Sequence, residues 1–343
     1  MKIAIHHRPG SFSDRWIQYC EENKISFKIV NCYDSDIVAK VKDCDVILWH
    51  HSQTFYKDVL FAKQLLFSLQ KAGKIVFPDF DTAWHFDDKL GQKYLFEAVG
   101  AELVPSYVFY TKDEAIEWIN STTFPKVFKL RGGASSSNVK LVKTKSDALR
   151  FTKIAFTCGF SQFDRFGNLK ERIRKYKEGK VNFVSLLKAV ARLFVPTEFS
   201  KMHGREKGYV YFQDFIADND HDIRIIVIGD KAFGLKRMNR DNDFRASGSG
   251  KIIYDESQIP IETVKLSFEY NKKLNAQCVA FDYIFGNNKE ILLTEISYGF
   301  VQNAYNNCNG YWDENLLWHK ETFIPEYFML DDIVKKLRMN SKV

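Results

Sequence analysis

The chain has 343 residues, 45% of them hydrophobic and 27% charged, a globular composition with enough apolar residues for two or three lobes. No apolar run approaches the roughly 20 residues of a membrane-spanning helix, and the six cysteines include no Cys-x-x-Cys pair, which argues against a membrane-embedded, disulfide-stapled or cysteine-zinc protein. The formal net charge is +7, and residues 170–207 account for it, with eleven lysines and arginines against four glutamates. Because the start of the chain shows no signal-peptide pattern, we expect a cytoplasmic protein.

Residues 1–80 alternate short apolar segments with amphipathic ones. The expected strands cover residues 3–6, 26–30, 45–50 and 74–77, and the expected helices begin near Ser13, Asp36 and Asp58. Such alternation predicts parallel strands joined by crossover helices. We therefore expect an α/β domain over residues 1–85.

The rest of the chain predicts mixed α+β structure. A helix is expected over residues 88–100, ended by Gly100. Then come expected strands at 106–110, 125–130, 139–142, 209–215, 222–228, 232–238, 279–285 and 291–296, with helices at 112–120, from 146, at 261–274 and at 316–339. Short turns at 229–230 and 286–288 predict antiparallel hairpins. We expect a central subdomain over residues 86–205 and a C-terminal subdomain over 206–343.

One strand ends in a lysine that precedes a loop of small residues. Lys129 is followed by the segment from Gly132 to Ser137, which ends in Ser135, Ser136 and Ser137. Backbone N–H groups of small residues can approach an anion closely, so a polyphosphate would fit here. The segment lacks the Gly-Lys-Ser/Thr ending of a Walker A motif, and a plain hairpin with a polar loop is the alternative.

Charged residues also mark two later strands. Asp222 and Arg224 open a strongly apolar strand, where unpaired charges are costly to bury. They either form an internal ion pair, with each other or with Lys236, or bind a ligand, the carboxylate at a ribose hydroxyl and the guanidinium at a phosphate or carboxylate. Arg237, Arg240 and Arg245 lead into a glycine-serine loop, which predicts a phosphate clamp or a solvated basic loop.

Two acids lie on neighbouring expected strands. Asp282 and Glu295 flank a short turn, so both carboxylates can converge on one point. Neighbouring carboxylates repel each other unless a cation lies between them, and hard oxygen ligands suit Mg²⁺. A pair bonded to lysine or arginine is the alternative. The histidines form no metal-binding set.

In this order and spacing, the signals resemble the ATP-grasp superfamily over nearly the whole chain. That family has a pre-ATP-grasp α/β lobe and two α+β lobes that hold ATP between them. Residues 209–216 resemble its interlobe strand, and the Asp222–Arg224 motif resembles that of the glutathione synthetase and RimK-like branches. The resemblance implies an ATP and magnesium site. Its ATP-binding residues would be Lys89, Lys129, Ser135, Ser136, Ser137, Gln213, Asp214, Phe215, Ile216 and Asp222, and its metal ligands Asp282, Glu295 and Ser297.

The sequence departs from the family pattern at Ser297, because the family usually places asparagine two residues after the glutamate. Ser247 likewise stands where relatives often carry asparagine, so metal number or geometry can differ. The segments around Arg245 and Tyr298, and residues 309–313, are similar to a less characterised ATP-grasp group that often accompanies bacterial surface-polysaccharide enzymes.

The resemblance implies an ADP-forming ligase that joins a carboxylate to an amine through an acyl phosphate. Arg224, Arg237 and Arg245 would stabilise the transferring phosphoryl group, and the substrates would be small sugar acids, amino acids or amino sugars of polysaccharide biosynthesis, carried on a nucleotide or lipid in some cases. A kinase that phosphorylates a hydroxyl and a non-catalytic ATP-binding scaffold are the alternatives. A dimer is the expected assembly.

Residues 158–207 interrupt the region where a compact ATP-grasp domain continues directly to its interlobe strand. A basic stretch at 170–180 precedes an amphipathic helix at 181–195. Three interpretations are open: a lid or packing helix over the cleft, contact with an anionic substrate or membrane surface, and nucleic-acid binding. The last is disfavoured because no nucleic-acid-binding module accompanies the charge.

Overall fold

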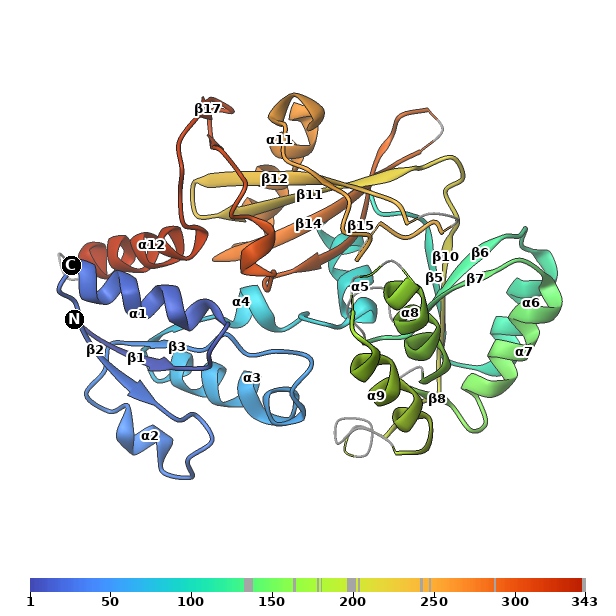
Figure 1. The fold of residues 1–343 in the computed structure, drawn as a ribbon, viewed down its shortest axis with the longest axis horizontal. Coiled ribbons are helices and arrows are strands. Elements are labelled where there is room, and N and C mark those ends of the chain that lie inside the picture. The colour runs from blue at the N-terminus through green and yellow to red at the C-terminus, as the bar shows by residue number, and fades with distance from the viewer. Residues whose placement is uncertain are drawn as a thin grey trace.

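The computed structural model describes residues 1–132, 138–162, 165–177, 179, 181–195, 202, 204–240, 243–246, 248–286 and 288–340 (Figure 1). Three sheets organise this part of the chain. Among its helices, none is long and apolar enough to cross a membrane.

The first sheet is parallel, as the alternating sequence predicts, with strand order β2-β1-β3-β4. Its strands are β1 (Lys2–His6), β2 (Ser26–Val30), β3 (Val46–Leu48) and β4 (Ile75–Phe77), and its helices are α1 (Phe12–Glu22), α2 (Ile37–Lys40), α3 (Tyr56–Lys71) and α4 (Phe80–Ala83). Successive side chains of a strand point to opposite faces, so the buried Ile3 and Ile5 pack on one side and Ala4 on the other. Both faces of this sheet are therefore covered.

The second sheet is antiparallel, with strand order β5-β10-β6-β7. It consists of β5 (Ser106–Phe109), β6 (Lys126–Lys129), β7 (Val139–Val142) and β10 (Val210–Asp214), with α6 (Lys112–Ser121) and α7 (Lys145–Ala155) packed on one face. The connecting helix α5 (Lys89–Val99) begins where the Asp88 carboxylate accepts the Gly91 N–H, and it ends at Gly100 with φ of 67°.

The third sheet has the order β15-β14-β11-β12-β16-β17, with β13 beside β12. Its members are β11 (His221–Ile228), β12 (Lys231–Met238), β13 (Ile252–Ile253), β14 (Cys278–Phe285), β15 (Ile291–Ser297), β16 (Tyr311–Asp313) and β17 (Trp318–His319). The hairpins β11–β12 and β14–β15 are antiparallel, as predicted.

The two faces of the third sheet bury different neighbours. Ile226 and Ile228 pack into a core shared with the first sheet, whereas Ile225 and Val227 pack into a second core with α5 and α11 (Ile261–Leu274). This alternation explains why β11 is apolar at nearly every position. The shared core joins the N-terminal and C-terminal parts of the chain.

The C-terminal helix is shorter than expected. A helix was predicted over residues 316–339, but β17 occupies the start of that range and α12 (Pro325–Asn340) begins nine residues later. Trp318 pairs with Trp312 in the β16–β17 hairpin, so sheet pairing overrides the helical pattern there. In Figure 1, α12 lies beside α1, where the Tyr19 hydroxyl donates to Asp331 at 2.5 Å.

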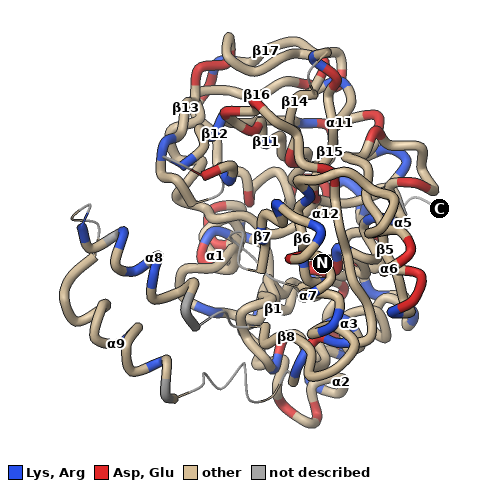
Figure 2. The backbone as a smooth tube through the Cα atoms, turned by 90° about the vertical axis from the view of Figure 1, so that its right-hand side faces the viewer, with Lys and Arg blue, Asp and Glu red and all other residues tan. Residues whose placement is uncertain are grey.

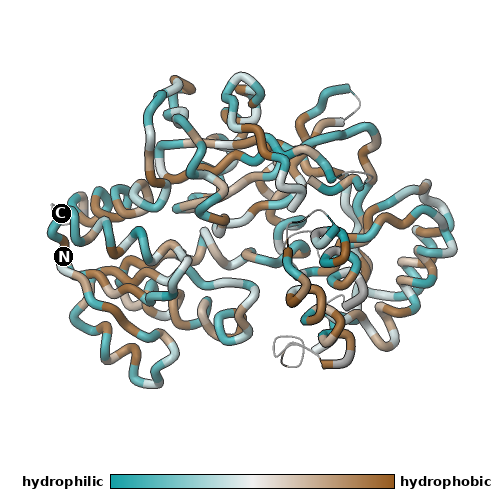
Figure 3. The backbone as a smooth tube through the Cα atoms, viewed as in Figure 1, coloured by the Kyte–Doolittle hydropathy of each residue, from teal (hydrophilic) through white to brown (hydrophobic). Residues whose placement is uncertain are grey.

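Between α7 and β10, two short strands, β8 (Phe160–Ser161) and β9 (Arg205–Glu206), form the base of a helical insertion. The insertion contains α8 (Arg165–Lys177) and α9 (Phe183–Phe194). Only the second of these helices is predicted by the sequence. Figure 3 shows the apolar stretches of α9 in brown.

Candidate active site

Strand pairing in the third sheet brings two acids and two arginines together. Asp222 lies opposite Arg237, and Arg224 lies opposite Asp282. Arg237 donates from Nε and Nη2 to the two oxygens of Asp222 at 2.6 Å each, and Arg224 donates in the same way to Asp282 at 2.6 Å. A further bond of 2.9 Å from Arg237 to Asp282 Oδ1 joins the pairs. We call these four residues the buried ion network.

The two arginines favour the charged form of Asp282, whereas burial outweighs them at Asp222 and raises the pKa of that carboxyl. Burial alone would raise the pKa of Asp282, but Arg224 and Arg237 outweigh it and lower the pKa to about 2. Asp222, Arg237 and Asp282 are each less than one-tenth exposed. Buried charges are tolerated when they are paired and hydrogen-bonded, as here. Asp222 and Arg224 therefore form ion pairs within the protein, but with Arg237 and Asp282 and not with each other.

Glu295 lies beside the network on the next strand. It pairs with Asp282 across β14 and β15, as the sequence predicts for the two acids. Lys89, the first residue of α5, places Nζ 3.2 Å from Glu295 Oε1. Burial would lower the pKa of Lys89, but Glu295 and Asp87 outweigh it and the net shift is upward. The Glu295 side chain remains 34% exposed, so it is accessible to a ligand.

Lys129 brings a second buried cation toward these acids from the second sheet. It lies at the end of β6, opposite Tyr211 of β10. Its pKa is lowered to about 8, mainly by burial: the neighbouring charge of Lys89 acts in the same direction, and Glu295 and Asp282 act in the opposite direction. Within the described ranges, Lys129 Nζ has no hydrogen bond or ion pair. Lys129 is therefore a buried lysine that lacks a bonded anion among the described residues but lies close enough to Glu295 and Asp282 for their charges to raise its pKa.

The acids offer hard oxygen ligands of the kind that Mg²⁺ prefers. Asp282 Oδ1 accepts from both arginines and Oδ2 from one, so Oδ2 retains acceptor capacity, and Glu295 is partly exposed. The third expected ligand, Ser297, instead donates its hydroxyl to Gly299 O at 2.8 Å. No group of three or more histidine, cysteine or acidic residues suited to a metal occurs in the part of the chain described. The donor set thus fits an ion that takes one or two protein carboxylates.

The residues predicted for the interlobe strand lie on β10, an inner strand of the second sheet, and just beyond its end. Gln213 is buried and donates from Nε2 to Ser106 Oγ at 3.0 Å. The Asp214 carboxylate accepts from Lys126 at 2.6 Å, so this side chain has a structural partner. Phe215 packs edge-on against Phe244, with ring centroids 5.7 Å apart, and Ile216 is half-buried. Any adenine contact here would therefore rely on the backbone.

Two other predictions concern loops. Arg245 binds the carboxylate of Asp243 through Nε and Nη2, at 2.9 and 2.5 Å, so the arginine has a local partner. Arg240 is buried. Ser135, Ser136, Ser137 and Ser247 lie outside the described residues.

A pocket of about 370 Å³ lies between the first sheet and the start of α5. Its wall carries residues that the sequence did not single out: Lys63, Trp84, Asp88, Arg131 and Glu206 among them. Arg131 donates to Asp88 Oδ2 at 2.6 Å, and Asp88 immediately precedes Lys89. The pocket is thus one residue from the lysine that contacts Glu295.

The same pocket contains a buried histidine. His51 Nε2 has no hydrogen-bond partner among the placed atoms, and burial lowers its pKa well below 6.5. His51 and its neighbour His50 are thus neutral near pH 7, as burial also lowers the pKa of His50 to about 3. Nothing in the sequence pattern indicated Lys63 or Arg131 at this wall, because those residues reach the pocket from distant elements.

Comparison with known proteins adds a family assignment for part of the chain. Residues 199–304 match the model of the RimK-like ATP-grasp domain. These residues contain β10, β11, β12, β14 and β15, and therefore the buried ion network and Glu295. No curated protein sequence matches the chain.

Solved structures resemble the chain at low identity. D-cycloserine synthetase DcsG superposes with a TM-score of 0.59 and 11% identity, covering 98% of this chain and 100% of its own. D-alanine–D-alanine ligase from Bacillus anthracis superposes with a TM-score of 0.51 and 16% sequence identity. The match covers 87% of this chain and 86% of the ligase. A third similar structure is the biotin carboxylase domain of 2-oxoglutarate carboxylase from Hydrogenobacter thermophilus, a dimer in complex with MgADP, ADP and bicarbonate. Its TM-score is 0.52 at 12% sequence identity, and the match covers 87% of this chain. This chain spans 64% of that domain's length.

Proposed function

We propose, on the premise that this chain has the ATP-grasp fold, that it is an ADP-forming ligase that joins a carboxylate to an amine. The observation that carries the proposal is the meeting of Lys89, Lys129 and Glu295, each from a different element, beside the buried ion network. Two buried lysines with accessible acid oxygens suit a polyphosphate with its metal. Similar structures named as a synthetase and a ligase support the same reaction class.

In this proposal ATP lies between the second and third sheets. Lys129 and Lys89 bind the phosphates, which gives Lys129 the anion that it lacks among the described residues. The backbone of residues 213–216 contacts the adenine, because the Gln213 and Asp214 side chains have other partners.

Glu295 and Asp282 would hold Mg²⁺, which neutralises phosphate charge when bound. A similar structure was determined with MgADP. Since the Ser297 hydroxyl is engaged with Gly299, two carboxylates are the protein's contribution to the metal. The buried ion network fixes Asp282 in position: Arg224 holds both of its oxygens, and Arg237 links it to Asp222.

The proposed chemistry has two steps. A substrate carboxylate oxygen attacks the γ-phosphorus, and the bond from that phosphorus to the bridging oxygen of ADP breaks. The amine nitrogen of the second substrate then attacks the acyl carbon, loses a proton, and releases phosphate that carries the former carboxylate oxygen. Lys89 and Lys129 offset the charge that moves with the phosphoryl group, which is the kind of positioning that supplies most of the rate in such reactions.

The pocket beside Asp88 is the proposed site of the acid and the amine. Arg131 offers a guanidinium for a carboxylate, and Asp88 and Glu206 offer acids for an ammonium group. We expect the substrates to be sugar acids, amino acids or amino sugars, in line with the polysaccharide association of the similar sequences. Arg131→Met is expected to raise the KM of the acid substrate more than it lowers kcat, whereas Arg150→Met, an exposed arginine of α7, is the matched control.

The test is Mg²⁺-dependent phosphate release from ATP with pooled sugar acids, amino acids and amino sugars. Release that requires both an acid and an amine, and that falls by about 10²-fold or more in Glu295→Gln, supports the ligase. A phosphorylated product without amide or free phosphate would identify a kinase instead. ATP binding with no turnover in any pool would favour a scaffold.

A further inference from the structure

The helical insertion extends away from the rest of the molecule. Figure 2 shows α8 and α9 projecting from the three sheets, and their main packing partner is each other. Ala189 of α9 is buried, and the ring of Tyr176 on α8 lies 6.2 Å from that of Phe183 on α9. The described residues that line the pocket beside Asp88 belong to neither helix.

One face of α9 is apolar and uncovered. Phe183, Leu187 and Val190 follow the i, i+4, i+7 spacing of a single helical stripe, and their exposed fractions are 55%, 52% and 40%. Val184, 55% exposed, widens the stripe. The buried Ala189 lies on the opposite side of the helix. Helix α9 therefore buries Ala189 on one side and leaves the side chains of Phe183, Leu187 and Val190 about half exposed on the other.

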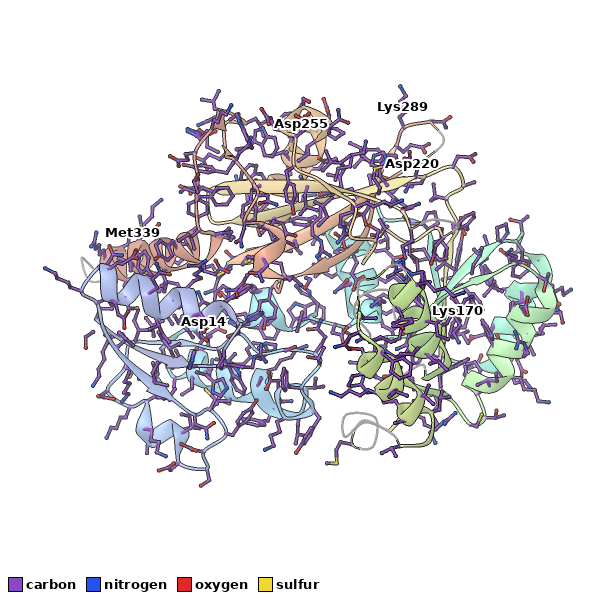
Figure 4. All side chains as sticks on the ribbon, viewed as in Figure 1. Asp14, Lys170, Asp220, Asp255, Lys289 and Met339 are labelled. Atoms are coloured by element: carbon purple, nitrogen blue, oxygen red, sulfur yellow. The ribbon has the colours of Figure 1, made fainter. Side chains whose placement is uncertain are left out.

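The hairpin is also strongly basic. Over α8 and α9 the sequence has eight lysines and arginines and a single glutamate, Glu171. Among the basic residues, Lys170, Lys177 and Lys188 are exposed, and Figure 4 labels Lys170 on α8. The net charge of +7 on two helices equals that of the whole chain. Function at the candidate active site does not explain this concentration of charge.

We propose that the α8–α9 hairpin binds the surface of an anionic lipid bilayer, with the Phe183–Leu187–Val190 stripe inserted among the lipids and the lysines at the headgroups. An exposed apolar stripe flanked by basic residues is the pattern of a helix that lies in a membrane interface. A second copy of the chain fits less well, because it would bring two hairpins of charge +7 together, whereas an anionic membrane surface attracts both. The protein would thereby act peripherally at a membrane, whatever reaction it performs.

The experiment is flotation of the full chain with vesicles of equal parts phosphatidylglycerol and phosphatidylcholine, and with vesicles of phosphatidylcholine alone. We expect binding to the anionic vesicles only, weakened by high salt. The double variant Phe183→Ser, Leu187→Ser is expected to bind about tenfold or more weakly, because both side chains lose apolar burial. Leu60→Ser, which removes an exposed leucine on α3, is the matched control and should bind like the wild type.

A second variant tests the contribution of the lysines while leaving the apolar residues of α9 unchanged. Lys170→Gln, Lys177→Gln, Lys188→Gln keeps the apolar stripe and is also expected to bind about tenfold or more weakly, since each lysine near an anionic surface contributes. No vesicle binding by the wild type, or equal binding by both variants, would overturn the proposal. A dimer that dissociates in the serine variant, without vesicle binding, would assign the stripe to a second copy and likewise overturn it.

Discussion

Arg224 donates two hydrogen bonds to the Asp282 carboxylate across neighbouring strands, each with a donor–acceptor distance of 2.6 Å. Asp282 therefore stabilises the pairing of the two strands, and in the proposed reaction it would also bind the metal. Arg237 makes the same kind of contact with Asp222 and reaches Asp282 as well. These contacts hold the Asp282 carboxylate in a fixed position between the two arginines.

Removing one acid of the buried ion network should destabilise the fold. Asp282→Asn leaves Arg224 and Arg237 with one buried negative partner between them, and breaking a buried pair typically costs about 3–5 kcal/mol. Urea unfolding measures this loss. Asp230→Asn, which removes a half-exposed acid bound to Lys231 at 2.8 Å, should cost about 1 kcal/mol or less. Equal costs for the two variants would mean that the network is not buried as described.

The charged Lys129 should lower the free energy of unfolding, although we expect it to bind the phosphates of ATP. Burial lowers its pKa from 10.5 to about 8, so at pH 7 the charged lysine costs about 3 kcal/mol relative to an exposed one. Lys129→Met removes that cost and should raise the free energy of unfolding at pH 7. The same variant should weaken ATP binding about tenfold or more, because it removes a charged donor to phosphate. A variant that binds ATP normally would place the phosphates elsewhere.

The same lysine predicts how stability depends on pH. Between pH 8 and pH 10.5 the unfolded chain keeps the proton of Lys129 while the folded protein has lost it, so the unfolded state binds more protons and stability rises with pH. Below pH 8 both states are protonated and this contribution is constant. The free energies of unfolding of the wild type and of Lys129→Met, measured across this pH window, should therefore approach each other as the pH rises. Parallel curves would contradict the lowered pKa.

Much of the fold follows from the sequence because its signals are local. Apolar alternation and short turns located β11, β12, β14 and β15 to within a residue or two, and cross-strand pairing of Asp282 with Glu295 followed from the hairpin. The β16–β17 hairpin was missed, because two short strands carry too few residues to outweigh a helical pattern. Helix α8 was missed because its charged sequence has little apolar periodicity.

The site was less predictable, because its partners come from distant parts of the chain. No sequence pattern pairs Arg131 with Asp88 or Lys126 with Asp214, because the partners lie 43 and 88 residues apart. It left open whether Asp222 and Arg224 pair internally. The structure shows that each pairs with a residue on an adjacent strand and not with the other.

A close backbone approach next to Arg224 gives a further prediction. A Cβ atom on Gly234 of β12 would lie 2.7 Å from the carbonyl oxygen of Arg224 and 2.6 Å from Ile225 Cδ1. Gly234→Ala should force β11 and β12 apart and cost about 1–3 kcal/mol in thermal or urea unfolding. Gly299→Ala is the matched control, since its nearest neighbour would be His50 Nε2 at 3.5 Å. An unchanged stability in Gly234→Ala would show that the strands can adjust without strain.

In the proposed reaction, a phosphoryl group passes from ATP to a carboxylate before the amide forms. The most direct measurement uses acid substrates whose carboxylates carry heavy oxygen, with mass analysis of the phosphate released in the presence of an amine. We expect one heavy oxygen in each phosphate released by the wild type and almost no phosphate from Glu295→Gln. Phosphate without the label would mean that water attacks ATP directly, and the proposed ligase reaction would be wrong.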